Sequence, residues 1–197
     1  MYPALLAVVV AGSLEPSGCP QDREYSRVLA HAETSLGAGM PQYVFCVFGS
    51  AEGRSAWLHS LEAYDKNTGQ RVAELPYPKE FAEGLGLVER SLLQGQPKFE
   101  DFNFDGYMDV SLLSFVGATG NSGANVWIYD SGSGEFVYER LLSQRKLKVH
   151  PERQEITSSW NGGHAGMIYG RDTIRWVDGE AAVVRSESAM GRRATML

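Results

Sequence analysis

Two segments of the chain follow one pattern that commits each of them to a β-hairpin. Leu61–Val72 and Val126–Val137 both run through an apolar stretch, a Tyr-Asp pair, two spacer residues, a Thr/Ser-Gly pair and a second apolar stretch. Aspartate accepts hydrogen bonds from backbone N–H groups two residues on, and glycine adopts the positive φ that closes such a turn. A shorter Asp-Gly hairpin follows Trp176. Hairpins repeated in this way are typical of propeller blades, sandwiches and barrels.

Other apolar runs predict strands along most of the chain. Strands are expected at Tyr43–Phe48, Ala56–Tyr64, Met108–Val116, Val126–Tyr129, Phe136–Leu142, Gln154–Trp160, Met167–Val177 and Ala181–Arg185. Helical periodicity favours helices only at Glu24–Leu36 and Phe81–Leu93, and the polar Ser186–Leu197 is expected to fray. The sequence therefore predicts an all-β protein with one compact antiparallel domain over residues 20–197. It would be propeller-like or a sandwich, because two clear hairpin copies are too few for a complete propeller.

The N-terminal residues read as an export signal. Leu5–Ala11 is an apolar run too short to span a bilayer, which takes about 20 residues, and it fits the apolar region of a secretory signal over residues 1–19. Cys19 follows Ser17-Gly18, as in lipoprotein signals, so one alternative is a lipidated Cys19 that anchors the protein to the outer membrane. Another is a disulfide between Cys19 and Cys46 in an oxidising compartment. For the apolar run itself, the alternative to an export signal is a buried N-terminal strand. We expect a periplasmic protein.

The sharpest motif is Asp101-Phe102-Asn103-Phe104-Asp105-Gly106-Tyr107-Met108-Asp109, of the form DxNxDGxxD. Its oxygen side chains at positions 1, 3, 5 and 9 and a carbonyl at position 7 predict a Ca²⁺ site, with candidate ligands Asp101, Asn103, Asp105, Tyr107 and Asp109. A strand follows the loop, and position 12 is not the glutamate of an EF-hand, so we expect a structural staple. The alternative is an acidic turn without metal, which the repulsion among three nearby carboxylates disfavours.

Charge and motifs narrow the classes of function. The chain holds 24 Asp and Glu against 18 Lys and Arg, a formal net charge of −6, which argues against a nucleic-acid partner. Gly120-Asn121-Ser122-Gly123 is not a nucleophile elbow, and no HExxH or nucleotide-binding glycine motif occurs. We therefore expect no catalytic residues and a protein that is not an enzyme.

Two loops are expected to form a contact surface. Gly117–Asn125 and Ser158–Gly166 are rich in Gly, Ser and Asn, whose backbones can approach a partner closely. The candidate partner-binding residues are Asn121, Ser122, Ser159, Trp160, Asn161 and His164. Tryptophan is enriched at interface hot spots. The alternatives are a core position for Trp160 and simple turn geometry for the glycines.

From Phe99 to about Trp176 the chain resembles a bacterial family of exported proteins. The resemblance rests on the DxNxDGxxD loop, the Gly/Ser/Asn loop after it, Asn125–Asp130 with Gly134-Glu135-Phe136, and Ile156–Trp160 with its Gly-rich loop and Ile174-Arg175-Trp176. The best-understood members of this family are periplasmic lipoproteins that act as immunity proteins against lysozyme-like effectors of a type IV secretion system. The resemblance implies a propeller-like fold with an FG-GAP-like calcium loop, and inhibition by insertion of a loop into the cleft of the hydrolase.

The expected function is accordingly that of a periplasmic inhibitor of a lysozyme-like peptidoglycan hydrolase. The cleft of such an enzyme carries two carboxylates beside the scissile bond. Ser122, Ser159 and His164 are candidates to hydrogen-bond them, with Trp160 as an apolar anchor. An acidic inhibitor is also steered toward a basic hydrolase. The alternative function is a calcium-stabilised adhesion or carbohydrate-binding module.

Overall fold

The computed structural model describes residues 18–20, 26–78, 85–117, 120–162 and 168–190. Most of the expected export signal and His164 lie outside this part of the chain. The strands are β1 (Arg27–Ser35), β2 (Gln42–Glu52), β3 (Ser55–Asp65), β4 (Arg71–Glu74), β5 (Gly86–Glu89), β6 (Lys98–Glu100), β7 (Asp109–Val116), β8 (Ser122–Asp130), β9 (Glu135–Tyr138), β10 (Leu147–His150), β11 (Glu155–Gly162), β12 (Ile168–Val177) and β13 (Glu180–Met190). Within the described residues the only helices are two 3-10 turns, η1 (Arg90–Leu93) and η2 (Pro151–Arg153), and none could cross a membrane.

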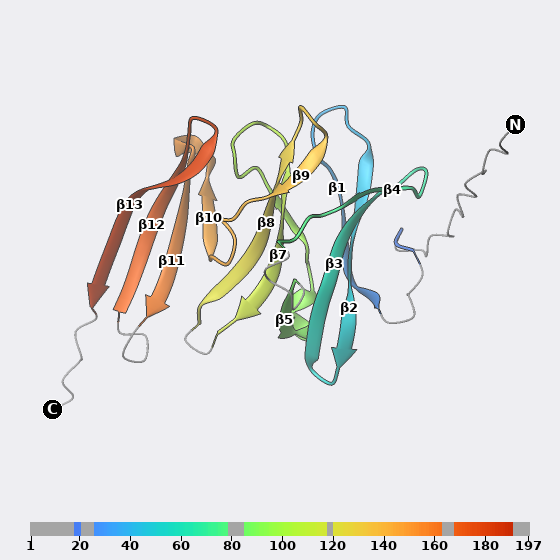
Figure 1. Ribbon diagram of the computed structural model, residues 1–197, viewed down its shortest axis with the longest axis horizontal. Helices are drawn as coiled ribbons and strands as arrows, with labels where there is room; N and C mark the ends of the chain where they lie inside the picture. Colours follow the sequence, from blue (N-terminus) through green and yellow to red (C-terminus); the bar gives the residue numbers. More distant parts are fainter. Residues whose placement is uncertain (1–17, 21–25, 79–84, 118–119, 163–167, 191–197) are drawn as a thin grey trace, which may run out of the picture.

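The strands form three antiparallel sheets that follow one another along the molecule in chain order (Figure 1). The first has the order β1-β2-β3-β4, with β5 also paired to β3; the second is β6-β7-β8-β9 and the third is β10-β11-β12-β13. Apart from β5, each sheet is a meander, because strands that neighbour in space are consecutive in the chain. The expected all-β, antiparallel fold is confirmed as a layered, sandwich-like arrangement, and the described strands close no barrel. A propeller-like relationship of the sheets stays a prediction.

The central sheet is buried on both faces, and β8 shows why its sequence is a continuous apolar run. Trp127 and Tyr129 pack into the core shared with the first sheet, whereas Val126 and Ile128 pack into the core shared with the third. Successive side chains of a strand point to opposite faces, so a strand between two cores needs apolar residues at every position. Trp127 is accordingly fully buried.

The repeated hairpins have the predicted turns. Asp65 Oδ1 accepts the N–H groups of Asn67 (2.9 Å) and Thr68 (2.8 Å), and Asp130 Oδ1 accepts that of Gly132 (2.9 Å). Hydrogen bonds from Thr68 lower the pKa of Asp65, and a hydrogen bond from Ser133 lowers the pKa of Asp130. Each hairpin closes the last strand pair of its sheet, β3–β4 and β8–β9, and β12–β13 closes the third.

Both expected helices are wrong where the structure describes them. The Glu24–Leu36 segment forms β1, which pairs with β2 from Arg27 to Ser35. Its weak helical periodicity is overridden because β2 offers a long strand with a buried centre to pair with. In the second segment, residues 85–93 form β5 and the turn η1, and β5 pairs with β3.

The ends of several strands also differ from expectation. Phe136–Leu142 is strand only to Tyr138, whereas β8 begins at Ser122, and β13 continues to Met190 through residues expected to fray. Ladder pairing with β12 orders β13, as Tyr169 faces Ala189 and Ile168 faces Met190. The first and last residues of these strands are set by pairing partners that are distant in sequence, so local composition does not reveal them.

Cys19 and Cys46 form a disulfide, and no described cysteine is free. Both residues are fully buried on the outer face of the first sheet, in a small core with Val44, Phe48 and Tyr64. Of the two fates considered for Cys19, the structure has the disulfide. The same sulfur cannot also carry a lipid thioether, so lipidation of Cys19 is incompatible with this form of the protein.

Candidate functional site

The acidic loop joins β6 to β7 and is closed by bonds from its own backbone. The N–H of Asp105 donates to Oδ1 of Asp101 (3.1 Å) and to Oδ1 of Asn103 (3.2 Å). The Gly106 N–H donates to Oδ2 of Asp101 (2.9 Å), and the Tyr107 N–H donates to Oδ1 of Asp105 (2.8 Å). Gly106 has φ of 88°, which a residue with a Cβ rarely adopts. The loop thereby gathers its oxygen atoms around one turn.

Asp109 holds the base of this loop. Its side chain is fully buried, and its two oxygens accept the N–H groups of Phe102 (2.7 Å) and Tyr129 (2.8 Å). Burial raises the pKa of Asp109 to about 7; the bonds from Tyr129 and Phe102 oppose that rise, and the charges of Asp105 and Asp101 add to it. Asp109 therefore ties the loop to β8 and carries a carboxyl group whose negative charge is costly without a positive neighbour.

The side-chain oxygen atoms of the loop are of the type that coordinates a hard cation such as Ca²⁺. Oδ1 of Asp101 and Oδ1 of Asn103 converge on one N–H, and Nδ2 of Asn103 lies 2.9 Å from Oδ2 of Asp105. A set of oxygens without nitrogen or sulfur ligands fits Ca²⁺. Across the described part of the chain, no three His, Cys, Asp or Glu side chains are gathered into a metal-binding group. Coordination by these residues, and by Tyr107 and Asp109, stays a prediction.

The acidic loop is also part of the core between the second and third sheets. Phe102 is buried there with Val126, Ile156 and Ile174. The Phe102 carbonyl accepts a hydrogen bond from the indole N–H of Trp176 on β12 (2.8 Å). The acidic loop is therefore tied to the third sheet by packing and by this hydrogen bond.

The two expected contact segments are brought side by side. Asn121, just before β8, and Asn161, near the end of β11, exchange two hydrogen bonds. Asn121 Nδ2 donates to the Asn161 carbonyl (2.6 Å), and the Asn161 N–H donates to Asn121 Oδ1 (2.7 Å). These bonds join residues 40 positions apart and fix the end of the second sheet against the end of the third. Much of both segments is strand, not loop as expected, since β8 begins at Ser122 and β11 ends at Gly162.

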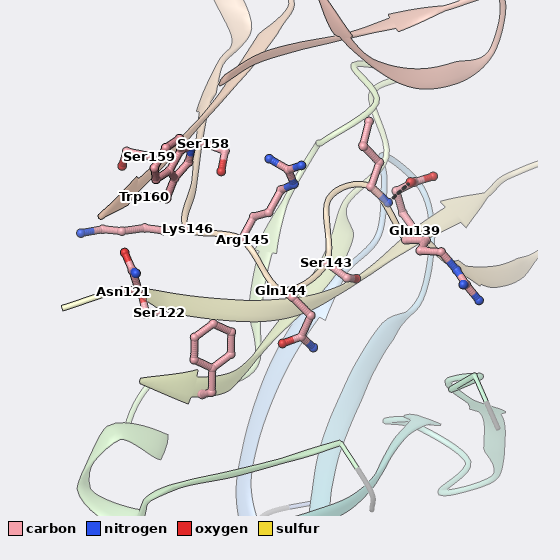
Figure 2. Close-up of a pocket in the computed structure, with 13 residues that line it drawn as sticks. Asn121, Ser122, Glu139, Ser143, Gln144, Arg145, Lys146, Ser158, Ser159 and Trp160 are labelled. Atoms are coloured by element: carbon pink, nitrogen blue, oxygen red, sulfur yellow. Dashed lines mark hydrogen bonds between the residues drawn. The ribbon is translucent and has the colours of Figure 1, made fainter. Parts of the chain in front are cut away.

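An open cavity of about 740 Å³ lies between these strand ends (Figure 2). Its wall is shared by the two predicted segments and by a third, residues 139–146; the lining residues are Phe115, Asn121, Ser122, Glu139, Arg140, Leu141, Ser143, Gln144, Arg145, Lys146, Ser158, Ser159 and Trp160. Four of the six predicted contact residues therefore line one cavity, and a fifth, Asn161, is bonded to its rim. We name the surface formed by residues 120–122, 145–146 and 158–161 the junction surface.

The segment 139–146 adds positive charge that the sequence reasoning did not use. Arg145 forms an ion pair with the largely buried Asp172 (2.7 Å), whose other oxygen accepts the Ser186 hydroxyl (2.7 Å). Burial opposes ionisation of Asp172, but the bonds from Ser186 and Arg145 outweigh it and lower its pKa. Lys146 is exposed beside Ser159, whose N–H donates to the Lys146 carbonyl (3.3 Å), and no described carboxylate lies within ion-pair distance of its ammonium group.

These cations were missed because they lie outside the Gly-rich segments on which the prediction relied. A sequence signal existed: Arg140, Arg145 and Lys146 form a basic cluster in an acidic chain. What the sequence could not provide was the backbone pairing of Arg145 with Ala124, which brings the cluster to the start of β8.

Ser159 and Trp160 line both this cavity and a second one of about 510 Å³, whose lining also includes Arg171 and Glu187. The indole lies against Gly170, its partner across the β11–β12 ladder: a Cβ atom on Gly170 would meet the ring carbon Cζ2 at 2.3 Å. Ser188 on β13 faces Gly170 in turn, so Trp160, Gly170 and Ser188 share one face of the sheet. The indole ring covers Gly170, and only a residue without a side chain leaves room for it there.

Comparisons with known proteins assign no family. No family model and no curated protein matches this chain. The chain is similar to a solved structure described as that of a Xanthomonas type IV secretion system related protein, with 18% sequence identity and a TM-score of 0.43. That alignment covers 84% of this chain and 77% of the other. A likeness at this identity and TM-score carries no functional assignment, so function has to be argued from the site.

Proposed function

We propose that this protein is a periplasmic inhibitor of a lysozyme-like peptidoglycan hydrolase and contacts the cleft of that enzyme through the junction surface. The observation that carries the proposal is the pair of hydrogen bonds between Asn121 and Asn161. They hold Ser122, Ser159 and Trp160 together at one cavity. A surface fixed in advance loses little conformational entropy on binding, which favours a stoichiometric inhibitor.

The chemistry of the junction surface complements a hydrolase cleft. A glycosidase cleft has two carboxylates flanking the scissile bond. The junction surface offers hydroxyl groups from Ser122 and Ser159 and positive charge from Arg145 and Lys146. The overall charge of −6 steers the protein toward a basic enzyme, and the local cations then face the acidic cleft.

Calcium has a structural part in the proposal. Asp101, Asn103 and Asp105 would hold the ion, together with the Tyr107 carbonyl and Asp109. The bound ion would neutralise carboxylates that otherwise repel one another. Because Phe102 in the same loop bonds to Trp176, an ordered loop would brace the third sheet, on which Trp160 lies.

The test is a titration of purified protein against a panel of lysozyme-like hydrolases, including any hydrolase whose gene lies next to the gene of this protein. The readout is the rate of clearing of a peptidoglycan suspension. We expect loss of activity at one inhibitor per enzyme for at least one hydrolase. Asn121→Ala should weaken inhibition about tenfold through loss of about 1.4 kcal/mol.

Asn67→Ala is the matched control, because Asn67 lies in the exposed β3–β4 turn of the first sheet. It should inhibit like the natural protein. Binding to intact peptidoglycan without inhibition of any hydrolase would support the alternative, a carbohydrate-binding module. Absence of inhibition across the panel at tenfold excess would overturn the proposal.

A further inference from the structure

The two faces of the third sheet differ in burial. Ile156 on β11 and Ile174 on β12 are buried in the core that this sheet shares with the second. Successive side chains of a strand point to opposite faces, so Ser159 and Arg171 lie on the face turned away from that core, and both are exposed. We call this face of the third sheet the outer face.

Three exposed residues form one row across the outer face. Ser159 pairs with Arg171 in the β11–β12 ladder. On the other side of β11, Leu147 pairs with Ser158, and the Ser159 N–H donates to the Lys146 carbonyl (3.3 Å), so the ladder continues and places Lys146 opposite Ser159. Residues directly opposite each other in a ladder have Cβ atoms about 5 Å apart. The Ser159 side chain is therefore flanked by a lysine and an arginine.

Neither of these two cations is neutralised by a neighbouring acid. Among the described residues, no carboxylate lies within ion-pair distance of Lys146 or Arg171. Glu187, which faces Arg171 across the β12–β13 ladder, forms its ion pair with Arg185. Two positive charges on either side of a hydroxyl group attract an anion to the position above that hydroxyl.

We infer that Lys146, Ser159 and Arg171 form a binding site for an oxyanion, that is, a carboxylate or phosphate group carried by a ligand. The Ser159 hydroxyl would donate to one oxygen, and the guanidinium group of Arg171 presents paired N–H donors that fit either group. Ser159 and Arg171 line the cavity of about 510 Å³, and Ser159 and Lys146 line that of about 740 Å³. The site goes beyond the proposed function, and its occupant is a cleft carboxylate only if that function holds.

The distribution of charge along the chain favours an anion at the third sheet. Residues 145–197 contain nine Lys and Arg against six Asp and Glu, whereas residues 1–144 contain nine against 18. The first two sheets therefore repel an anion, and the third sheet attracts one. Repulsion by most of the molecule favours a single anionic group at one place over an extended anionic surface such as a membrane.

The experiment follows the amides of Lys146 and Ser159 and the Arg171 Nε–H by ¹H–¹⁵N NMR in the full chain. The probes are sodium phosphate and sodium acetate, each exchanged for sodium chloride at constant ionic strength and pH 7. We expect shifts that saturate in the millimolar range. Saturation with one anion alone would support the site and identify which group occupies it. Shifts that do not saturate with either anion would overturn the inference.

Variants localise the bound anion. Lys146→Gln and Arg171→Gln should each weaken binding about fivefold, as expected for loss of one exposed charge interaction. Glu187→Gln should strengthen binding about twofold, because it removes the negative charge that faces Arg171. Arg54→Gln is the matched control, since it removes one positive charge from the exposed β2–β3 turn. If this control weakened binding as much as Arg171→Gln, the effect would be one of net charge and the site would be rejected.

The outcome is separable from that of the proposed function, because the anion titrations need no hydrolase. Binding of phosphate or acetate with the expected variant pattern, but without inhibition of any hydrolase, would support this inference and reject the hydrolase as partner. Inhibition of a hydrolase by a protein that binds neither anion would support the proposed function and overturn this inference.

Discussion

Asp172 shows how single residues control the junction surface. Its carboxylate accepts the Arg145 guanidinium and the Ser186 hydroxyl, each at 2.7 Å, and so ties the segment before β10 to the third sheet. Since Arg145 lines the cavity, the position of a positive charge at the junction surface depends on an acid beneath it.

We expect Asp172→Asn to lower the free energy of unfolding by roughly 2 kcal/mol at neutral pH, the usual value of a hydrogen bond to a charged group. The pKa of Asp172 is lowered in the folded state. Its contribution is therefore complete above the unfolded pKa, near 4, and is lost as the pH falls through the folded value. Urea denaturation at pH 7, 5 and 3 should show the difference between the natural protein and the variant shrinking toward pH 3. A difference independent of pH would contradict this role.

A second prediction concerns Trp160. If this ring anchors the partner, Trp160→Ala should weaken hydrolase inhibition roughly thirtyfold, as expected for a hot-spot loss of 2 kcal/mol. Trp57→Ala is the control: Trp57 is exposed, whereas Trp160 is half-buried, and Trp57 lies on β3 of the first sheet. The prediction is checked by measuring the inhibition constants of both variants against the same hydrolase. An equal weakening of inhibition in the two variants would contradict an anchoring role for Trp160.

Residue chemistry was the part of the site most open to prediction from sequence. Asn121, Ser122, Ser159 and Trp160 were identified by residue type in Gly-rich segments, and the structure brings them to one cavity. Lys146 and Arg145 were not identified in this way. Their position at the cavity depends on the backbone pairing of Arg145 with Ala124, which leaves no local pattern in the sequence. Nor does Gly170 look different from other glycines until Trp160 is seen lying on it.

At the scale of elements, the acidic loop carries the predicted calcium ligands and also packs between the second and third sheets. Asp109 fixes the loop to β8, and Phe102 fixes it to β12 through Trp176. Loss of an ion from this loop would therefore be felt as loss of packing in the third sheet.

Calcium should accordingly stabilise the protein against heat. At 100 times its dissociation constant, an ion that binds only the folded state adds about 2.7 kcal/mol, which is a rise of about 5 to 10 °C in Tm for a chain of this size. Differential scanning calorimetry in calcium and in chelator measures it. Asp105→Ala should abolish the difference. Asp130→Ala, which alters a similar turn in the β8–β9 hairpin, should retain it. Equal Tm values of the natural protein in calcium and chelator would contradict the ion site.

The disulfide gives a second test at this scale. Cys19 and Cys46 are 27 positions apart, and closing a loop of that length stabilises a chain by about 3.5 kcal/mol in the entropy model. Reduction should lower the denaturation midpoint in urea, and Cys19→Ala should remove the sensitivity to reductant. A natural protein insensitive to reductant, or one whose Cys19 carries a lipid by mass spectrometry, would contradict the pairing.

Sequence patterns predicted the hairpin turns better than the limits of strands. Asp65 and Asp130 make the bonds expected of them because those bonds are local, with partners two or three residues on. The Glu24–Leu36 segment was expected to be helical but forms β1, since its state is decided by β2, which begins at Gln42. Strand identity outside the hairpins thus depends on partners that local periodicity does not reveal.

At the scale of the whole molecule, the stacking of three sheets determines where the junction surface lies. The second and third sheets share a core through Val126, Ile128, Ile156 and Ile174, and their strand ends meet at Asn121 and Asn161. The first sheet, with the disulfide on its outer face, lies at the other end of the stack (Figure 1). The all-β class was predictable from the hairpins, whereas the number and order of layers followed only from the pairing.

The most direct test of the central claim is hydrogen exchange of this protein with and without a bound lysozyme-like hydrolase. We predict that added protection of backbone amides is concentrated at residues 120–123 and 158–162, with lesser protection at 145–146. Exchange of the β2 amides should be unchanged. Protection on the first sheet instead, with none at the strand ends joined by Asn121 and Asn161, would contradict the claim that the junction surface is the inhibitory surface.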